Sequence, residues 1–296
     1  GAIERIARDR ARRALPVRVH VNGTRGKSTV TRMIWSALVE AGVPAVAKTT
    51  GTRPRLLLPD RREEAVARHA PASIREQLWL LRRARRAGAR AVVVECMAVD
   101  PALQWVTEHD MIRATLGVIT NVRVDHLEAM GETRGEIAHA LANTIPRGGV
   151  LVLGDAPFAR LFEHRAAPLG TRVVVAGEPA AVAGDPAACS AADRQNEATA
   201  LAVCRELGLD EETARRGIRR APADPGAASG GAFDAGGRRV AWLDATSAND
   251  PESLDLLAAA GISPPGHLVV FNHRADRPLR LVAFAKIGRA SCRERV

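Results

Sequence analysis

The sequence predicts an α/β fold with a mostly parallel sheet, followed by a second, smaller α/β domain. Short apolar runs alternate along the chain with segments of helical periodicity, the order expected when helices cross between parallel strands. Near the start, a strand-like run leads through a glycine-containing turn into a helix, a combination typical of phosphate-binding sites. The chain has 296 residues and 46% hydrophobic residues, which is enough for a sizeable core in one or two domains.

The glycine-containing turn lies in the stretch 17–33, which reads VRVHVNGTRGKSTVTRM. The alternating apolar residues of 17–21 predict a short strand, and Asn22–Gly26 forms the turn. Lys27-Ser28-Thr29 then opens a predicted helix that ends near Glu40. Because backbone N–H groups of such a loop and of the helix N-terminus point at an anion, this stretch predicts a phosphate cradle, with the lysine at the terminal phosphates and the serine hydroxyl on Mg²⁺.

The glycine spacing departs from that of the common P-loop. That motif has a glycine five places before Gly26, where Val21 stands here, and the present form is G-x-x-G-K-S-T. A chance Gly-Lys-Ser turn is the alternative. The strand before the turn and the helix after it supply the context that a phosphate loop requires and disfavour that alternative.

The later elements follow from their apolar patterns. A second strand is predicted at Val43–Ala47 and leads into the hydroxyl-rich loop Lys48–Thr52. Ser73-Ile-Arg-Glu76 has the capping-box pattern and opens a helix to about Gly88. The remaining predicted elements are strands at Ala91–Val94, Leu116–Thr120, Val150–Leu153 and Arg172–Val175, and a helix over about 133–143 that Thr133 and Glu136 would cap.

Polar residues follow the ends of two predicted strands. Glu95 ends an apolar run, and Asn121 and Asp125-His126 follow the next one. Glu95 alone would also suit a solvent-exposed strand end, and an Asp-His pair is weak evidence by itself. Since ligands bind beyond the carboxyl ends of parallel strands, these residues and the glycine loop are predicted to meet at one edge of the sheet.

Three segments carry a family resemblance: NGTRGKST, VVVECMAVDPALQW and TNVRVDHLEAMG. They resemble the Mur ligase superfamily of ATP-dependent amide ligases. The residues around Glu95 and the segment KTTGT at Lys48 resemble the branch of this superfamily that acts in poly-gamma-glutamate synthesis for capsule formation. The resemblance covers residues 17 to about 286. It implies a Mur-ligase-like central domain over 1–220 and a truncated, Rossmann-like C-terminal ligase domain over 238–286. Between them, residues 221–237 are rich in Pro, Gly, Ala and Asp, which predicts a linker.

The same resemblance implies ATP and Mg²⁺ as cofactors. Lys27 would contact the transferred phosphate, and Ser28, Glu95 and His126 would hold magnesium, while Asn121 and Asp125 would complete the catalytic set. The segment 193–196 resembles the adenine-contacting segment of the superfamily, although an ordinary helix N-cap remains open. The expected nucleotide-binding residues are Gly23, Thr24, Arg25, Gly26, Lys27, Ser28, Thr29, Asn196, Asp244, Asn249 and Arg274.

Two departures from the superfamily pattern stand out. Many members carry a carbamoylated lysine some way after the motif histidine, whereas residues 139–143 contain no lysine. Many also place an arginine at the hinge, and residues 222–226 contain none. We therefore expect no second metal site built from a modified lysine.

The function implied is that of an ATP-dependent amide ligase. It activates a glutamate carboxylate as an acyl phosphate and joins it to the amine of another glutamate, as in poly-gamma-glutamate synthesis. The alternatives within the same chemistry are a folylpolyglutamate-type ligase and a cell-wall Mur ligase. A P-loop nucleotide switch or kinase would explain the glycine loop but not Glu95, Asp125-His126 and the second domain.

Charge and composition bear on partners. The formal net charge is +10, which could suit a nucleic-acid-binding ATPase, but aromatic residues make up only 3% of the chain and tyrosine is absent. We therefore expect no nucleic-acid partner. The resemblance implies a glutamate or polyglutamate substrate and small membrane-protein subunits of a synthase complex, and a homo-oligomer remains open.

No apolar run is long enough to span a membrane, and no signal peptide is evident. The four cysteines lack metal-binding spacing and suit reduced thiols. The expected location is therefore the cytoplasm, and the membrane-protein partners that the resemblance implies would hold the chain at the inner face of the cell membrane. The chain begins with Gly1, so a preceding piece is expected, and 287–296, IGRASCRERV, reads as the translation of a sequencing adaptor.

Overall fold

The computed structural model of the chain describes residues 9–51, 53–68, 71–177, 191–225 and 229–244. The chain divides into two compact units, one comprising 1–181 and 192–224 and the other comprising 182–191 and 225–296. The predicted phosphate loop lies in the first unit. The described residues of the second form a β-hairpin.

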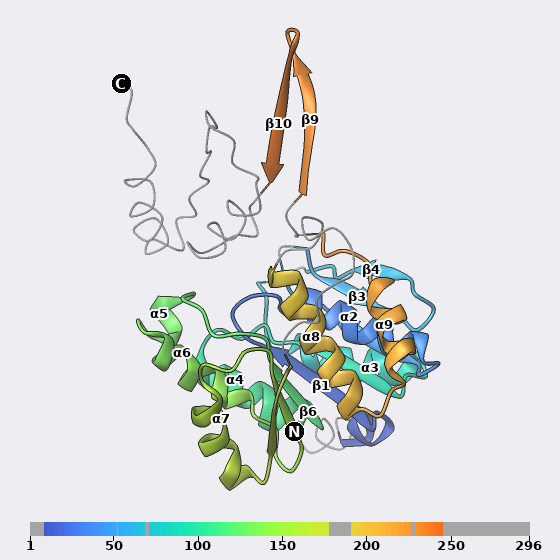
Figure 1. Ribbon diagram of the computed structural model, residues 1–296. Coiled ribbons are helices and arrows are strands. Elements are labelled where there is room, and N and C mark those ends of the chain that lie inside the picture. Colours follow the sequence, from blue (N-terminus) through green and yellow to red (C-terminus); the bar gives the residue numbers. More distant parts are fainter. Residues whose placement is uncertain (1–8, 52, 69–70, 178–190, 226–228, 245–296) are drawn as a thin grey trace. The chain divides into compact units, whose positions relative to one another are not determined.

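The first unit is built on a single sheet. Its strands are β1 (Val17–Asn22), β2 (Ala45–Lys48), β3 (Arg55–Leu57), β4 (Glu63–Ala65), β5 (Ala91–Glu95), β6 (Leu116–Ile119), β7 (Val150–Leu153) and β8 (Arg172–Val175). The spatial order is β4-β3-β2-β5-β1-β6-β7-β8 (Figure 1). All pairings from β2 across to β8 are parallel, and the β3–β4 hairpin adds an antiparallel edge. The predicted mostly parallel sheet is confirmed.

The two central strands are buried on both faces. β5 is apolar up to Glu95, and every residue of it is buried, as its unbroken apolar run predicts. In β1, Val19 and Val21 pack in the largest hydrophobic cluster. The intervening His20 and Asn22 are also buried, so the polar side chains of this alternating strand require partners inside the protein.

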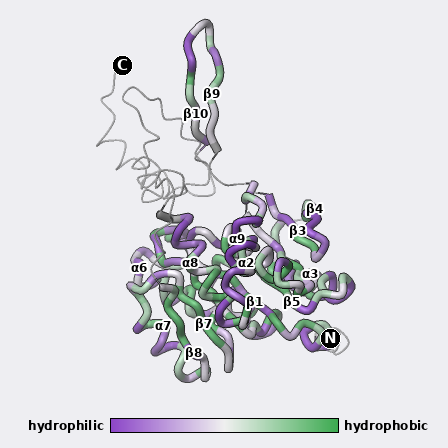
Figure 2. The backbone as a smooth tube through the Cα atoms, turned by 45° about the vertical axis from the view of Figure 1, so that its right-hand side comes forward, coloured by the Kyte–Doolittle hydropathy of each residue, from purple (hydrophilic) through white to green (hydrophobic). Residues whose placement is uncertain are grey.

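Helices cover both faces of the sheet (Figure 1). They are α2 (Lys27–Glu40), α3 (Glu76–Arg86), α4 (Pro101–Val106), α5 (Leu127–Met130), α6 (Arg134–Leu141), α7 (Ala159–Ala166), α8 (Ala191–Glu206) and α9 (Glu211–Arg219), with a π-helical turn η1 (Thr107–Ile112) and 3₁₀ turns η2 (Ala142–Thr144) and η3 (Ala167–Leu169). Figure 2 shows the contrast between apolar β7 and polar α9. None of these helices combines the length and apolar character needed to cross a membrane.

Most predicted elements are found within one or two residues of their expected bounds. α2 starts at Lys27 and ends at Glu40 as predicted. Thr133 and Glu136 form the predicted capping box at the start of α6. The predicted cap at Ser73 is wrong: α3 begins at Glu76 without a side-chain cap, because that glutamate is engaged in ion pairs with lysine and arginine side chains.

Part of the predicted linker forms a strand in the second unit. Residues 221–237 were expected to lack secondary structure, but β9 (Ser229–Ala235) pairs antiparallel with β10 (Arg238–Asp244). Gly236 and Gly237 both have positive φ and join the two strands, the conformation that a tight hairpin turn requires. The predicted strand near 240–243 lies within β10. Asn249, Arg274 and the rest of the predicted C-terminal domain lie outside the described residues.

Candidate active site

The glycine loop between β1 and α2 depends on two glycines. Gly23 has a φ of 123°, and a Cβ there would lie 2.1 Å from Thr120 Oγ1. Gly26 has a φ of 77°, and a Cβ there would lie 2.2 Å from Asn196 Oδ1. Only glycine fits both the conformation and the space. Asn196, the predicted adenine contact on α8, therefore lies directly against the loop.

Asn121 fixes the shape of this loop. Its Oδ1 accepts hydrogen bonds from Thr24 Oγ1 at 2.7 Å and from the Arg25 N–H at 3.0 Å. Its Nδ2 donates to the Arg25 carbonyl at 3.2 Å. The residue was expected among the catalytic set. Since its amide is already occupied by the loop, we assign it a positioning role.

Replacing Asn121 with alanine should weaken nucleotide binding. The change removes three hydrogen bonds that hold the loop, each worth on the order of 1 kcal/mol, so we expect the Kd for MgADP to rise at least about tenfold. Isothermal titration calorimetry measures this. Asn143→Ala is the matched control, because the Asn143 side chain donates to the carbonyls of His139 and Ala140 and lies outside the glycine loop. Equal affinity in the two variants would contradict the positioning role.

Lys27 folds back over the loop that precedes it. Its Nζ donates to the Gly23 carbonyl at 2.7 Å and to the Thr24 carbonyl at 3.1 Å. Burial lowers the pKa of Lys27, while Glu95 and Asp125 act in the opposite direction. The ammonium therefore lies in the loop with two carboxylates acting on it, in a place suited to phosphate oxygens.

Ser28 and Glu95 meet at the carboxyl edge of the sheet. Ser28 Oγ donates to Glu95 Oε2 at 2.8 Å, and the Thr50 N–H donates to the same oxygen at 2.7 Å. Glu95 is 3% exposed, so it is not the solvent-facing strand end that the sequence left open. Ser28 at the start of α2 and Glu95 at the end of β5 are thus in contact, as predicted, and Thr50 from the loop after β2 lies beside them.

The end of β2 and the start of α3 supply residues near the site that sequence reasoning did not include. Lys48 is fully buried and its Nζ lies 2.9 Å from Glu76 Oε2. Gln77, next to Glu76 on α3, donates from Nε2 to the Glu95 carbonyl at 3.2 Å. These contacts fix the backbone around Glu95. The hydroxyl-rich sequence of the loop was the available signal, but nothing in it indicated the partner on α3.

A second polar group follows β6. Arg25 Nη2 lies 3.4 Å from Asp125 Oδ2, and His126 Nε2 lies 3.7 Å from the same oxygen. His126 has a φ of 51°, an uncommon conformation for a residue other than glycine, and such positions cluster at functional sites. His126 was predicted, together with Ser28 and Glu95, to hold magnesium ions. The structure places it in a group with Asp125 and Arg25.

The donor set at Ser28 and Glu95 fits Mg²⁺. A hydroxyl and a carboxylate are hard oxygen ligands, and Mg²⁺ is commonly held by one or two carboxylates together with substrate phosphates and water. Within the described part of the chain, no three His, Cys, Asp or Glu side chains cluster closely enough to hold a metal by themselves. The geometry therefore suits a metal held jointly by protein and phosphate.

The other predicted site residues divide by location. Thr29 is half-buried in the first turn of α2. That helix has no side-chain cap and no acidic residue in its first turn, so no carboxylate of the helix would compete with a bound anion for its N-terminal N–H groups. Asp244 ends β10 in the second unit. Asn249 and Arg274 lie beyond the described residues.

Comparison with known proteins gives two family matches. Residues 21–203 match the Mur ligase middle domain, and residues 232–295 match the poly-gamma-glutamate synthase CapB C-terminal domain. The second match includes most of 287–296.

Two curated proteins are similar over nearly the whole chain. PGA synthase CapB of Bacillus subtilis (strain 168) is 37% identical over 292 residues, covering 96% of this chain and 74% of that protein. Capsule biosynthesis protein CapB of Bacillus anthracis is 36% identical over 280 residues, covering 92% of this chain and 60% of that protein.

Solved structures share the fold. The S73A mutant of L. casei FPGS has a TM-score of 0.65 at 15% identity, over 88% of this chain and 74% of that one. E. coli FolC in complex with DHPP and ADP has a TM-score of 0.55 at 21% identity, over 76% of this chain and 61% of that one.

Proposed function

Because this chain belongs to the Mur ligase family, in the branch of the poly-gamma-glutamate synthase CapB proteins, we propose that it is an ATP-dependent ligase that joins glutamate residues through amide bonds. In the proposed reaction the γ-phosphoryl group of ATP passes to a glutamate carboxylate. The amine of a second glutamate then attacks the carbonyl carbon, phosphate leaves, and an amide bond forms.

The observation that carries the proposal is the meeting of Lys27, Ser28 and Glu95 at one edge of the sheet. Phosphoryl transfer requires positioning and charge neutralisation more than covalent participation by the protein. An ammonium in the glycine loop and a hydroxyl paired with a buried carboxylate meet those needs.

Each group has a distinct task. The glycine-loop and α2 N–H groups would bind the phosphates, and Lys27 would pair with the oxygens whose negative charge grows during transfer. Ser28 and Glu95 would hold Mg²⁺, which neutralises phosphate charge and orients the transferred group. Asn121 and Thr50 fix the loop and the carboxylate in place.

The proposal extends to substrate and partners. Glutamate or a growing poly-γ-glutamate chain would be the substrate, and small membrane-protein subunits would bring the chain to the inner face of the cell membrane. The family and the name of the B. subtilis relative, a PGA synthase, support the substrate class. The fold alone would equally suit the folylpolyglutamate synthases, so the acceptor must be tested.

Glutamate-dependent ADP release tests the reaction. The full chain is incubated with MgATP, with and without glutamate and a γ-linked glutamate oligomer, and products are separated by chromatography. We expect ADP release that requires glutamate and yields γ-linked products. ADP release of equal rate without glutamate would instead favour a nucleotide switch or ATPase.

Glu95→Gln should raise the Mg²⁺ requirement. The amide keeps the shape but loses the negative charge of the ligand, so we expect about a tenfold higher Mg²⁺ concentration for half-maximal ADP binding. Calorimetric titration of ADP at a series of Mg²⁺ concentrations measures this without catalysis. Glu163→Gln, an exposed change on α7, is the control. Identical Mg²⁺ dependence in both variants would make Glu95 structural.

A further inference from the structure

A cavity of about 360 Å³ lies at the opposite edge of the sheet from the glycine loop. Arg18, the second residue of β1, lines it, and so do Thr115 and Gly148, which closely precede β6 and β7. The glycine loop follows the other end of β1. Since a strand rises about 3.3 Å per residue, roughly 13 Å of strand separates Arg18 from Asn22. The cavity is therefore separate from the proposed phosphate site.

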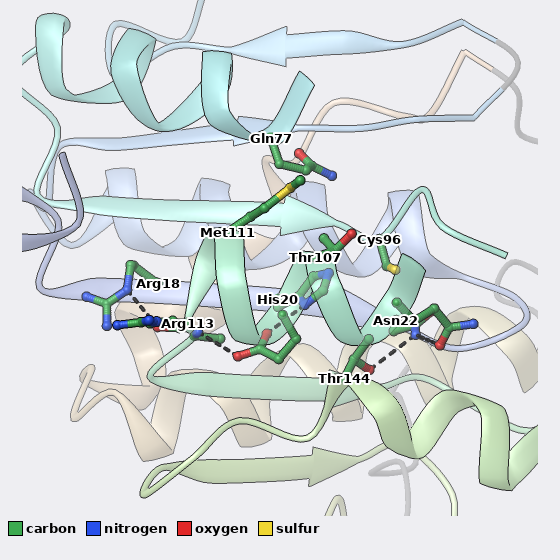
Figure 3. A network of polar contacts seen from close by, with 12 residues as sticks. Arg18, His20, Asn22, Gln77, Cys96, Thr107, Met111, Arg113 and Thr144 are labelled. Carbon is green, nitrogen blue, oxygen red and sulfur yellow. Dashed lines mark hydrogen bonds and ion pairs between the residues drawn. The ribbon is translucent and has the colours of Figure 1, made fainter. Parts of the chain in front are cut away.

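Three arginines line this cavity: Arg18, Arg113 and Arg147. Arg18 donates from Nε to the Arg113 carbonyl at 2.8 Å and from Nη1 to the Leu15 carbonyl at 2.7 Å, and Arg113 donates from Nε to the His109 carbonyl at 3.1 Å. Figure 3 shows Arg18 and Arg113 side by side. Carbonyl partners orient guanidinium groups but leave their charge unneutralised.

Elsewhere in the described part of the chain, many arginines pair with carboxylates. Arg32 with Glu63 and Arg172 with Glu206 are examples. Arg18, Arg113 and Arg147 form no salt bridge with any described carboxylate. The cavity thus gathers cationic groups that retain N–H donors.

The carboxylate in the lining, Glu108, acts on the charge of Arg18 but forms no salt bridge with it, because its oxygens bond to other groups. Glu108 Oε2 is 2.8 Å from His20 Nδ1, and its Oε1 accepts from the Ala114 N–H at 2.8 Å. Both oxygens therefore bond to groups other than the three arginines. Burial lowers the pKa of His109, with Arg147 acting in the same direction and Glu108 against it. The imidazole adds ring nitrogens to the lining beside the three arginines.

We propose that this cavity binds a ligand with several carboxylates, and that the ligand is a γ-linked glutamate oligomer. The choice of oligomer rests on the proposed function. Guanidinium groups bind carboxylates in paired hydrogen bonds, and several arginines around one cavity favour a ligand with several charges. The volume lies at the lower end of the range for small-ligand pockets. The site would hold a part of the chain distant from its reacting end.

The test is equilibrium binding of γ-linked tetraglutamate, free glutamate and inorganic phosphate to the full chain at low and moderate salt. We expect the oligomer to bind most tightly and its affinity to fall with salt. Arg147→Glu should weaken oligomer binding at least about tenfold, because it replaces an attractive charge with a repulsive one. Arg147→Gln should give a smaller loss.

Arg160→Glu is the matched control, because Arg160 is an exposed arginine on α7 outside the cavity and the change in net charge is the same. MgADP binding is measured for every variant and should be unchanged. If Arg147→Glu and Arg160→Glu lost the same oligomer affinity, the cavity would not be the binding site. If inorganic phosphate bound as tightly as the oligomer, the oligomer would not be the ligand. If the chain bound MgADP but not the oligomer, the proposal for this cavity would be refuted and the proposed function would stand. Absent MgADP binding would count against the proposed function.

Discussion

Replacing Lys27 with alanine should abolish ATP turnover while the fold survives. Among the described residues, the ammonium donates to the Gly23 and Thr24 carbonyls, and Lys27 is not part of the hydrophobic clusters. In the proposed reaction it neutralises charge that develops on the transferred phosphoryl group. Removing one such donor from a preorganised site costs on the order of 10²–10³ in rate, so turnover should fall to near background.

The measurement pairs glutamate-dependent ADP release with circular dichroism and thermal unfolding of the same variant. We expect a melting temperature close to that of the parent chain, because no buried apolar contact is lost. Lys27→Met provides a closer match in side-chain length and should be equally inactive. If either variant released ADP at the parent rate with its fold intact, the assignment of the glycine loop as a catalytic phosphate site would be wrong.

Local patterns made the phosphate loop predictable. The order strand, loop, helix is set by residues that are neighbours in the sequence. The loop needs positive φ at Gly23 and Gly26, and glycine adopts such values readily. The strand ends carrying Glu95 and Asn121 followed from unbroken apolar runs. The resemblance drawn from these same segments is confirmed by the family matches over residues 21–203 and 232–295.

What sequence reasoning missed depends on contacts between distant segments. Lys48 and Glu76 form an ion pair across 28 positions of the chain, and no local pattern indicates that pairing. Asn121 was expected in the catalytic set, but its hydrogen bonds to Thr24 and Arg25 in the glycine loop could not be read from its place after a strand. The β9 strand was mistaken for a linker because Gly and Ala dominate it. The Gly236-Gly237 turn between alternating residues was the hairpin signal that should have outweighed that composition.

The polar residues of β1 show the same limit more sharply. His20 and Glu108 are separated by 88 positions, yet their side chains lie 2.8 Å apart with both almost fully buried. Nearby, Asn22 Nδ2 donates to Gln104 Oε1 at 3.0 Å and to Thr144 Oγ1 at 3.2 Å. Strand alternation alone favours a solvent-facing side for such residues. The helical layer over them supplies the partners instead.

Breaking the buried pair should strongly destabilise the first unit. His20→Gln leaves the Glu108 carboxylate buried with the Ala114 N–H but without its cationic partner. Removing one member of a buried ion pair costs about 3 kcal/mol or more in unfolding free energy, because the remaining charge is uncompensated. Urea unfolding of the full chain, followed by circular dichroism, measures the loss. His164→Gln, an exposed change on α7, should have almost no effect.

The stability difference between the parent chain and His20→Gln should also depend on pH. Burial by itself would lower the pKa of His20, but the contacts with Cys96 and Glu108 outweigh it and raise the pKa to about 10 from the ordinary 6.5. Because the folded state holds the proton more tightly than the unfolded chain, the stabilisation is fully present below pH 6.5 and declines as pH rises towards 10. Unfolding curves of the parent, His20→Gln and His164→Gln are measured at pH 6, 8 and 9.5. The difference in unfolding free energy between the parent and His20→Gln should shrink as the pH rises, and the difference between the parent and His164→Gln should not. A difference that stayed constant or grew with pH would mean that His20 is neutral in the folded protein.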